Sequence, residues 1–176
     1  MDYRLFVAID LPDAVRDELS VLCRHLERVR WTPQDQFHLT LRFIGRGDGA
    51  LVRDLCEQLS SLEPDPFSLI LAGTGYFPPR GMPNILWAGV QPSDQLKKLY
   101  RRVDEALFYC GVKREGRKFA PHITLGRLTG EPHDAVGEWL AGTASFRSSS
   151  FDVRSFHLYT SRLTSRGALH TKLASF

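Results

Sequence analysis

The chain contains 176 residues, of which 43% are hydrophobic and 24% are charged, and its formal net charge is +3. This composition is typical of a globular protein, and the weak positive charge is compatible with a phosphate-bearing substrate. The absence of a membrane-length apolar stretch and of a signal-peptide pattern argues against a membrane partner. The three cysteines are widely separated, which argues against a disulfide framework and a zinc cluster. We therefore expect a single domain over residues 1–176, monomeric and cytoplasmic.

The first part of the chain predicts two strands and two helices. Arg4–Ile9 is an apolar run that predicts a buried strand. Apolar residues then recur at helical spacing from Val15 onward, which predicts a helix that extends to about Arg30. A strand is expected at Phe37–Ile44, ended by three glycines, and leucines at helical spacing predict a second helix that ends near Leu62.

The middle of the chain predicts two strands and a long helix. The strands are expected at Phe67–Ala72 and Ile85–Val90, separated by a long loop of Gly and Pro residues over 73–84. Ser93 is a typical N-cap residue and Gly111 a typical C-terminal stop, so a third helix is expected between them.

The last part predicts a strand at Phe119–Leu125, a short helix around Trp139, and strands at Phe151–Thr160 and Ala168–Ala174. In both halves of the chain, a strand containing His-x-Thr precedes a helix and then a pair of strands. The sequence therefore predicts an α+β fold of two similar lobes, each with an antiparallel sheet flanked by helices. An approximate twofold axis would relate the lobes, with a central cleft between the two His-x-Thr strands.

The two His-x-Thr motifs are the most informative feature of the sequence. His-Leu-Thr-Leu begins at His38, and His-Ile-Thr-Leu begins at His122. Side chains alternate between the faces of a strand, so each His shares a face with its Thr, Thr40 or Thr124. One such pair is usually structural, but two copies with four apolar neighbours favour a functional interpretation. Two imidazoles at one site can act as a general acid and a general base without a metal or another cofactor.

The motifs resemble those of a known family. The segments Phe37–Gly45 and Pro121–Arg127 resemble the paired signatures of the 2H phosphoesterases. Within that superfamily, the chain resembles the bacterial and archaeal RNA 2′,3′-cyclic phosphodiesterases, formerly called 2′-5′ RNA ligases. The resemblance extends to the first strand at Arg4–Pro12, the Trp strand at Ile85–Gly89 and the closing strand at Leu158–Leu163.

The resemblance implies a reaction and roles for the motif residues. It implies hydrolysis of 2′,3′-cyclic phosphate at RNA ends, or in cyclic nucleotides, to a 2′-phosphate. His38 would be the general acid for the ribose 3′ oxygen and His122 the general base for water, although the residues alone leave these roles unassigned. Thr40 and Thr124 would donate hydrogen bonds to the phosphoryl oxygens, where charge grows in the transition state.

Two arginines are candidates for binding the phosphate. The family pattern implies this role for Arg127, which simple alternation from His122 places on the opposite face unless Gly126 breaks the alternation. Arg42 shares the face of His38 by alternation, and its alternative interpretation is a solvated arginine at a strand end.

Phe77 is a candidate for stacking on a nucleobase from the loop that also contains Tyr76. The alternative is that these two rings fix the loop to the core. Trp87 is expected in the core.

The chain departs from the family at two positions. It has Asn84 where a basic residue often precedes the Trp strand, and His170 where a Tyr is frequent. Neither position is expected to touch the catalytic pairs.

Three alternatives to hydrolysis remain open. One is formation of a 2′-5′ RNA bond, which reverses the same in-line chemistry. Another is an RNA-binding module without catalysis, for which Arg or Lys would serve better than His. The last is that both His-Thr pairs are structural.

Overall fold

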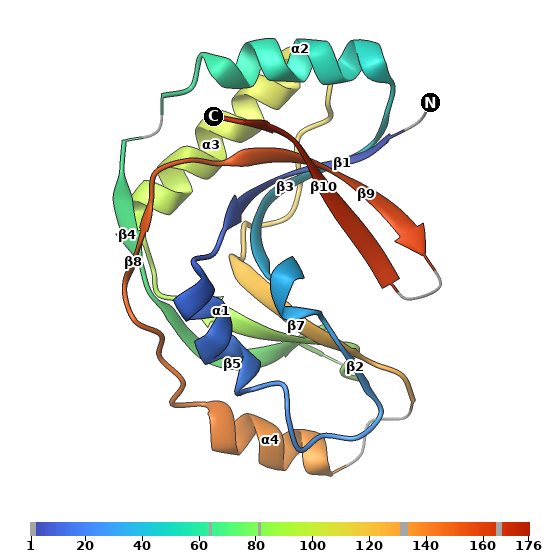
Figure 1. The fold of residues 1–176 in the computed structure, drawn as a ribbon, viewed down its shortest axis with the longest axis vertical. Coiled ribbons are helices and arrows are strands. Elements are labelled where there is room, and N and C mark those ends of the chain that lie inside the picture. The colour runs from blue at the N-terminus through green and yellow to red at the C-terminus, as the bar shows by residue number, and fades with distance from the viewer. Residues whose placement is uncertain (1–2, 64, 81, 131–133, 165–166) are drawn as a thin grey trace.

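The computed structural model describes residues 3–63, 65–80, 82–130, 134–164 and 167–176, which form a mixed α+β fold (Figure 1). The strands are β1 (Tyr3–Asp10), β2 (Val29–Trp31), β3 (His38–Gly47), β4 (Phe67–Leu69), β5 (Leu71–Phe77), β6 (Ile85–Val90), β7 (His122–Leu128), β8 (Phe151–Val153), β9 (His157–Thr164) and β10 (Gly167–Ser175). The helices are α1 (Asp13–Ser20), α2 (Gly49–Ser60), α3 (Asp94–Tyr109) and α4 (Ala135–Thr143), with a 3-10 turn at Gln34–Gln36.

One large antiparallel sheet runs through the molecule. Its strand order is β10-β9-β1-β3-β7-β6-β5, with β2 also paired to β7, while β4 and β8 form a separate pair. In Figure 1, β1, β3, β9 and β10 lie in the upper half with α2 and α3, and β2, β5 and β7 lie in the lower half with α1 and α4. The predicted α+β class with antiparallel sheets and helices is confirmed.

The core lies between the sheet and the helices. Leu5 to Ile9 of β1 are all buried, because β1 lies inside the sheet between β3 and β9. Helix α3 buries one apolar face, and its start and end match the sequence prediction. The Ser93 hydroxyl accepts a hydrogen bond from the Leu96 amide at 3.1 Å, and Gly111 follows the helix with a φ of 80°. No helix in the described part of the chain is long and apolar enough to cross a membrane.

The first helix is shorter than predicted. Helix α1 ends at Ser20, and the helical spacing that continues beyond it belongs to a loop and to β2. His25 and Arg28 have φ values of 60° and 56°, a left-handed conformation that a right-handed helix cannot contain. Leu22 and Leu26 of this segment are still buried, but against the body of the protein rather than as one helix face.

The predicted loop 73–84 was wrong in its first half, because β5 continues to Phe77 and pairs with β6. Gly75 explains the error. A segment rich in glycine indicates a loop, whereas this glycine makes room for a neighbouring side chain within a strand. A Cβ on Gly75 would lie 2.2 Å from the Trp87 ring, which covers this part of the sheet. The predicted strand Phe151–Thr160 is likewise two strands, β8 and β9.

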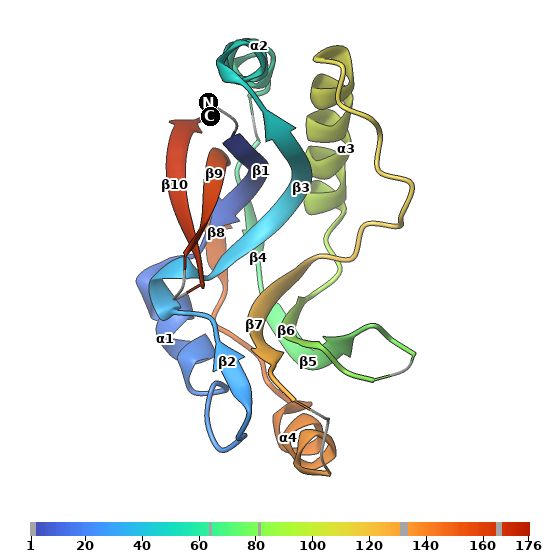
Figure 2. The same ribbon diagram turned by 90° about the vertical axis from the view of Figure 1, so that its right-hand side faces the viewer.

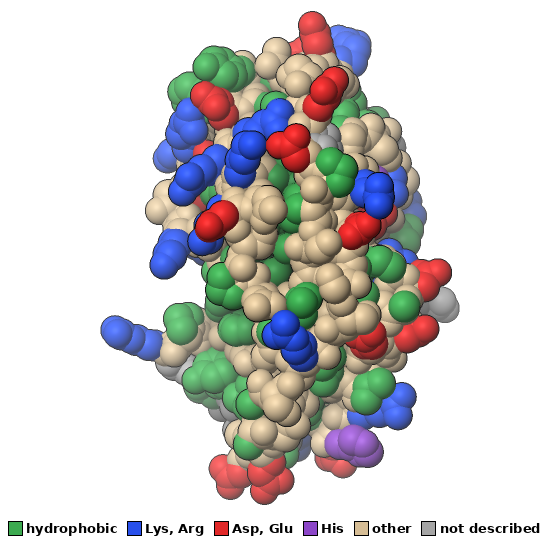
Figure 3. Space-filling view, turned by 90° about the vertical axis from the view of Figure 1, so that its left-hand side faces the viewer, with side chains coloured by type: hydrophobic (Ala, Val, Ile, Leu, Met, Phe, Trp, Pro, Cys, Tyr) green, Lys and Arg blue, Asp and Glu red, His purple; other side chains and the backbone are tan. Residues whose placement is uncertain are grey.

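Two further views show the surroundings of the sheet. Figure 2 shows β3 and β7 approaching one another, with the short β2 beside β7. Figure 3 shows the side of the molecule that carries β4 and β8, where basic and acidic side chains are interspersed. The ion pairs Lys98–Asp65 and Arg154–Asp152 are both exposed. Exposed pairs of this kind contribute little to stability.

Candidate active site

The two His-x-Thr motifs meet where β3 and β7 cross. Leu39 pairs with Ile123 in an antiparallel register, and both side chains are fully buried. The register therefore sets His38 opposite Thr124 and Thr40 opposite His122 on the other face of the sheet. In such a ladder the two histidines are diagonal neighbours, with about 7–8 Å between their Cα atoms. That spacing leaves room for a small group between the two rings.

The two imidazole rings are held in the same way. His38 Nδ1 lies 2.8 Å from the carbonyl oxygen of Gln36, and His122 Nδ1 lies 2.8 Å from that of Ala120. A carbonyl oxygen can only accept, so Nδ1 of each ring carries the proton. Nε2 of each neutral ring therefore keeps its lone pair and can accept a proton. When a ring is protonated, the same Nε2 becomes a donor.

The surroundings of His38 disfavour its charged form. The pKa of His38 is lowered from 6.5 to about 4, mainly by burial, with smaller contributions in the same direction from charge on His170 and His122. The bond to Gln36 and the charge of Asp10 act in the opposite direction.

An aromatic cluster surrounds the His38 ring. The Phe6 and His170 rings lie with their centroids each 5.1 Å from that of His38. The expectation that position 170 does not touch the catalytic pairs was therefore wrong. The last two strands bring His170 to the first motif, although it lies far from His38 in the sequence. The contact of Phe6 with His38 was not predicted either, because Phe6 lies on another strand, β1.

His122 has a different aromatic neighbour. The Phe77 ring meets the His122 ring edge-on, with 4.8 Å between centroids, and lies 5.5 Å from the Trp87 ring. Burial also lowers the pKa of His122. Trp87 is half-buried beside Thr124 on this face rather than inside the core as expected. Phe77 and Trp87 thus form one wall of the site.

Strands β3 and β7 each contain a β-bulge after the motif. The extra residue is Leu41 in β3, relative to β1, and Leu125 in β7, relative to β6. A bulge shifts the alternation of side chains by one position. Two successive residues in each strand, Leu41–Arg42 and Leu125–Gly126, are consequently buried. Simple alternation from the motifs therefore fails beyond these bulges.

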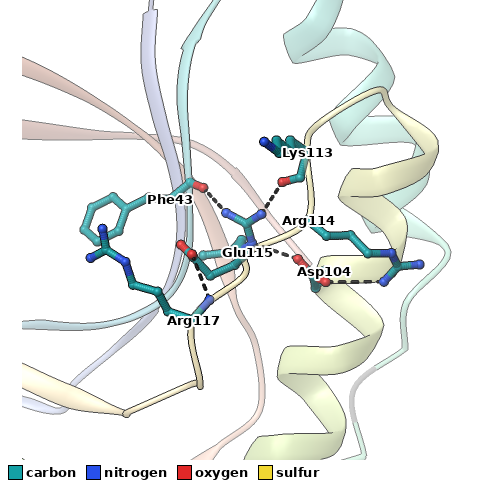
Figure 4. A network of polar contacts seen from close by, with 7 residues as sticks. Phe43, Asp104, Lys113, Arg114, Glu115 and Arg117 are labelled. Carbon is teal, nitrogen blue, oxygen red and sulfur yellow. Dashed lines mark hydrogen bonds and ion pairs between the residues drawn. The ribbon is translucent and has the colours of Figure 1, made fainter.

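The predicted position of Arg42 was wrong for this reason. Its side chain is 6% exposed, and its Nε donates to Asp104 on α3 at 2.8 Å. Its other nitrogens donate to the carbonyl oxygens of Phe43 and Lys113 (Figure 4). Arg42 is neither on the face of His38 nor solvated, since these three acceptors bind it on the buried side of β3.

The bulge in β7 has the opposite effect on Arg127. After Leu125 and Gly126, which are both buried, the exposed Arg127 returns to the face of His122 and Thr124. The break in alternation that its predicted role requires is therefore present. Phe43 occupies the corresponding place after the bulge in β3 and is 65% exposed.

The hydroxyl groups of Thr40 and Thr124 are available for a ligand. Both side chains are half-buried on the site face, and neither hydroxyl has a hydrogen bond to another described residue. Among the described residues, no group of three or more His, Cys, Asp or Glu side chains is arranged to hold a metal ion. The arrangement offers two proton carriers, two neutral donors and one cation on one face.

Comparison with known proteins identifies a matching family and several similar sequences. A family model for LigT-like phosphoesterases matches residues 9–87 and 89–170. The RNA 2′,3′-cyclic phosphodiesterase of Archaeoglobus fulgidus is 32% identical, covering 98% of this chain and 99% of the relative. The protein of the same name from Thermus thermophilus is 34% identical, covering 98% of this chain and 89% of the relative.

The fold agrees with solved structures of similar proteins. Escherichia coli LigT complexed with 3′-AMP has a TM-score of 0.82 at 26% identity, covering all of this chain and 98% of that one. TT0787 of Thermus thermophilus has the same TM-score and identity, covering 98% of this chain and 96% of that one. These matches confirm the resemblance seen in the two motifs and extend it over nearly the whole sequence. The chain belongs to the family of LigT-like phosphoesterases.

Proposed function

We propose that the chain hydrolyses 2′,3′-cyclic phosphate at RNA ends to a 2′-phosphate by acid-base catalysis, without a metal. The observation that carries this proposal is the meeting of two imidazoles held in the same way, His38 and His122, beside the threonine hydroxyls of the two motifs. Relatives named RNA 2′,3′-cyclic phosphodiesterase and the LigT complex with 3′-AMP support the choice of substrate.

The proposed reaction is an in-line displacement at phosphorus. Nε2 of neutral His122 takes a proton from water, whose oxygen bonds to phosphorus. Nε2 of protonated His38 gives its proton to the 3′ oxygen as the bond from that oxygen to phosphorus breaks. His122 is then protonated and His38 neutral, and exchange with solvent restores both. Thr40 and Thr124 donate hydrogen bonds to the two remaining phosphoryl oxygens.

The lowered pKa values of both histidines suit the general base, which must be neutral, whereas the general acid must gain its proton when the substrate binds. Burial keeps both rings neutral in the free protein near neutral pH. The negative charge of a bound phosphate would favour protonation of one nearby ring, and we assign that proton to His38. Substrate binding would then be accompanied by proton uptake.

Arg127 and Phe77 complete the proposed site. Arg127 stabilises the charge on the phosphate from the face it shares with His122. The Phe77 ring offers an apolar surface on which the terminal base can stack, and its edge contact with His122 fixes that ring.

We further propose that residues 1–176 form one domain of two interwoven halves with pseudo-twofold symmetry about the Leu39–Ile123 pair. The sheet order β9-β1-β3 is repeated in reverse as β7-β6-β5. Helices α2 and α4 each follow a motif strand, and β4, which follows α2, pairs with β8, which follows α4. The site then lies between the halves, with one His from each.

The product of the reaction tests this proposal. Purified protein with a chelator is incubated with a short RNA that ends in 2′,3′-cyclic phosphate, and the phosphorus NMR spectrum is recorded. We expect a 2′-phosphomonoester from the native protein and unchanged cyclic phosphate from the His38→Ala/His122→Ala variant. Binding without turnover would instead indicate an RNA-binding module, and turnover by the double variant would refute the assignment of the site.

A further inference from the structure

Two arginines face one another directly beside the proposed site. Arg30 of β2 pairs with Arg127 of β7 in an antiparallel register, and both side chains are exposed. Like charges at opposed positions of a sheet destabilise it. Among the described residues, neither guanidinium has a hydrogen bond or an ion pair that would offset this repulsion. An anion bound between them would remove it.

Arg30 points to the same face as the catalytic pairs. A Cβ on Gly126 would lie 2.7 Å from Val29 Cγ1 and 2.9 Å from Trp31 Cε3, so these two side chains cover Gly126 on the buried side. Trp31 continues toward the core, where its ring lies 6.1 Å from that of Trp139. Arg30 lies between Val29 and Trp31 in β2 and therefore projects from the opposite face.

The backbone of β2 is held at both ends against β7. The Thr32 amide donates to the carbonyl oxygen of Leu125 at 2.8 Å, and the Thr129 amide donates to that of Arg28 at 2.8 Å. β2 occupies the same edge of β7 that β3 leaves after its pairing at Ile123. Arg30 is thus fixed where the two halves meet. It lies along the edge of β7 that also pairs with β3, the strand that contains His38.

We infer that Arg30 binds a second phosphate, the one on the 5′ side of the terminal ribose, and that Arg127 lies between this phosphate and the cyclic phosphate and contacts both. This inference rests on the proposed function, which places the cyclic phosphate at the two motifs. Because Leu125 is an extra residue in β7, Arg127 lies two positions beyond Thr124 in the register with β6, about 7 Å along the strand. Arg30 extends that positive charge sideways by one strand, beyond what one phosphate at the motifs requires. Guanidinium groups bind phosphate through paired hydrogen bonds.

The consequence is a preference among substrates. A nucleoside 2′,3′-cyclic phosphate has no second phosphate, whereas every RNA end has one. Charge-assisted hydrogen bonds of this kind correspond to about a tenfold effect or more. The protein should therefore act on RNA ends in preference to cyclic mononucleotides, with the difference arising at Arg30.

The test compares adenosine 2′,3′-cyclic phosphate with adenosine 5′-phosphate 2′,3′-cyclic phosphate, which differ only in the 5′ phosphate. We expect the native protein to have a kcat/KM about tenfold higher for the second substrate. Arg30→Gln should reduce this ratio about tenfold. Arg53→Gln removes the same charge from an exposed position of α2 and should keep the native ratio.

A second readout measures the charge that Arg30 contributes to RNA binding. The dependence of RNA binding on salt should weaken for Arg30→Gln, with the logarithmic slope reduced by about 0.7. Hydrolysis of both substrates at equal kcat/KM, or an unchanged ratio in Arg30→Gln, would overturn the inference while the proposed function stands. Hydrolysis of neither substrate by the native protein would overturn both.

Discussion

Arg42 gives the most specific prediction for a single residue, because the structure shows it buried and bonded to Asp104 rather than exposed in the site. Replacing Arg42 by Met keeps the length of the side chain but leaves Asp104 with Arg114, whose side chain is 51% exposed, as its remaining ionic partner at 3.3 Å. The Asp104 side chain is 12% exposed, so its charge would remain largely buried. Removing one partner of a buried ion pair costs about 3–5 kcal/mol. That is a large share of the roughly 5–15 kcal/mol that stabilises a typical domain.

Urea unfolding of native protein and Arg42→Met measures this cost, with kcat determined under conditions where both are folded. Arg154→Met is the matched control, because the Arg154–Asp152 pair is exposed and its loss should cost no more than about 1 kcal/mol. We expect Arg42→Met to lose about 3–5 kcal/mol and to retain its kcat within about threefold. A loss of stability below about 1 kcal/mol together with a hundredfold fall in kcat would show that Arg42 contacts the substrate.

The remaining predictions concern the site itself. Thr40→Val and Thr124→Val should each lower kcat by roughly 10- to 1000-fold, and a loss below about twofold would assign that Thr a structural role. Because the pKa of folded His38 is about 4 and that of the unfolded residue 6.5, the unfolded state binds more protons between these values. The free energy of unfolding should therefore fall as the pH decreases from 6.5 to 4. It should fall less in His38→Asn, and equal pH dependence of the two proteins would contradict the shift. Phe77→Leu should raise KM about tenfold if the ring stacks on the base, whereas a fall in kcat alone would mean that it only orients His122.

The position of each His beside its Thr on one face of a strand was predictable because it is local in the sequence. His38 and Thr40 share a face by strand alternation alone, and so do His122 and Thr124. The ends of α3 were predictable for the same reason, since caps depend on neighbouring residues.

What could not be predicted depends on pairing between distant strands. The bulge at Leu41 is defined only relative to β1, and it reverses the face of Arg42. The bulge at Leu125 is defined only relative to β6, and it brings Arg127 to the site. No local sequence signal distinguishes these two outcomes, because each segment taken alone predicts simple alternation of side chains between the faces of a strand.

The aromatic surroundings of the histidines show the same dependence on tertiary structure. His170 comes to His38 through the antiparallel β9–β10 pair, which no sequence spacing indicates. Gly75 was interpreted as a loop residue, although it is a strand residue that makes room for Trp87. Glycine is compatible with a loop or with a strand, and here packing against the Trp87 ring favours the strand.

His38 and His122 are proposed to act together as one acid-base pair. This pairing is tested by single-turnover rates of the native protein, His38→Asn, His122→Asn and the double variant on an RNA with a 2′,3′-cyclic phosphate end. If the two rings form one catalytic unit, each single variant should be nearly as slow as the double variant. If one single variant keeps a near-native rate, or if the two losses multiply in the double variant, the histidines do not act as a pair.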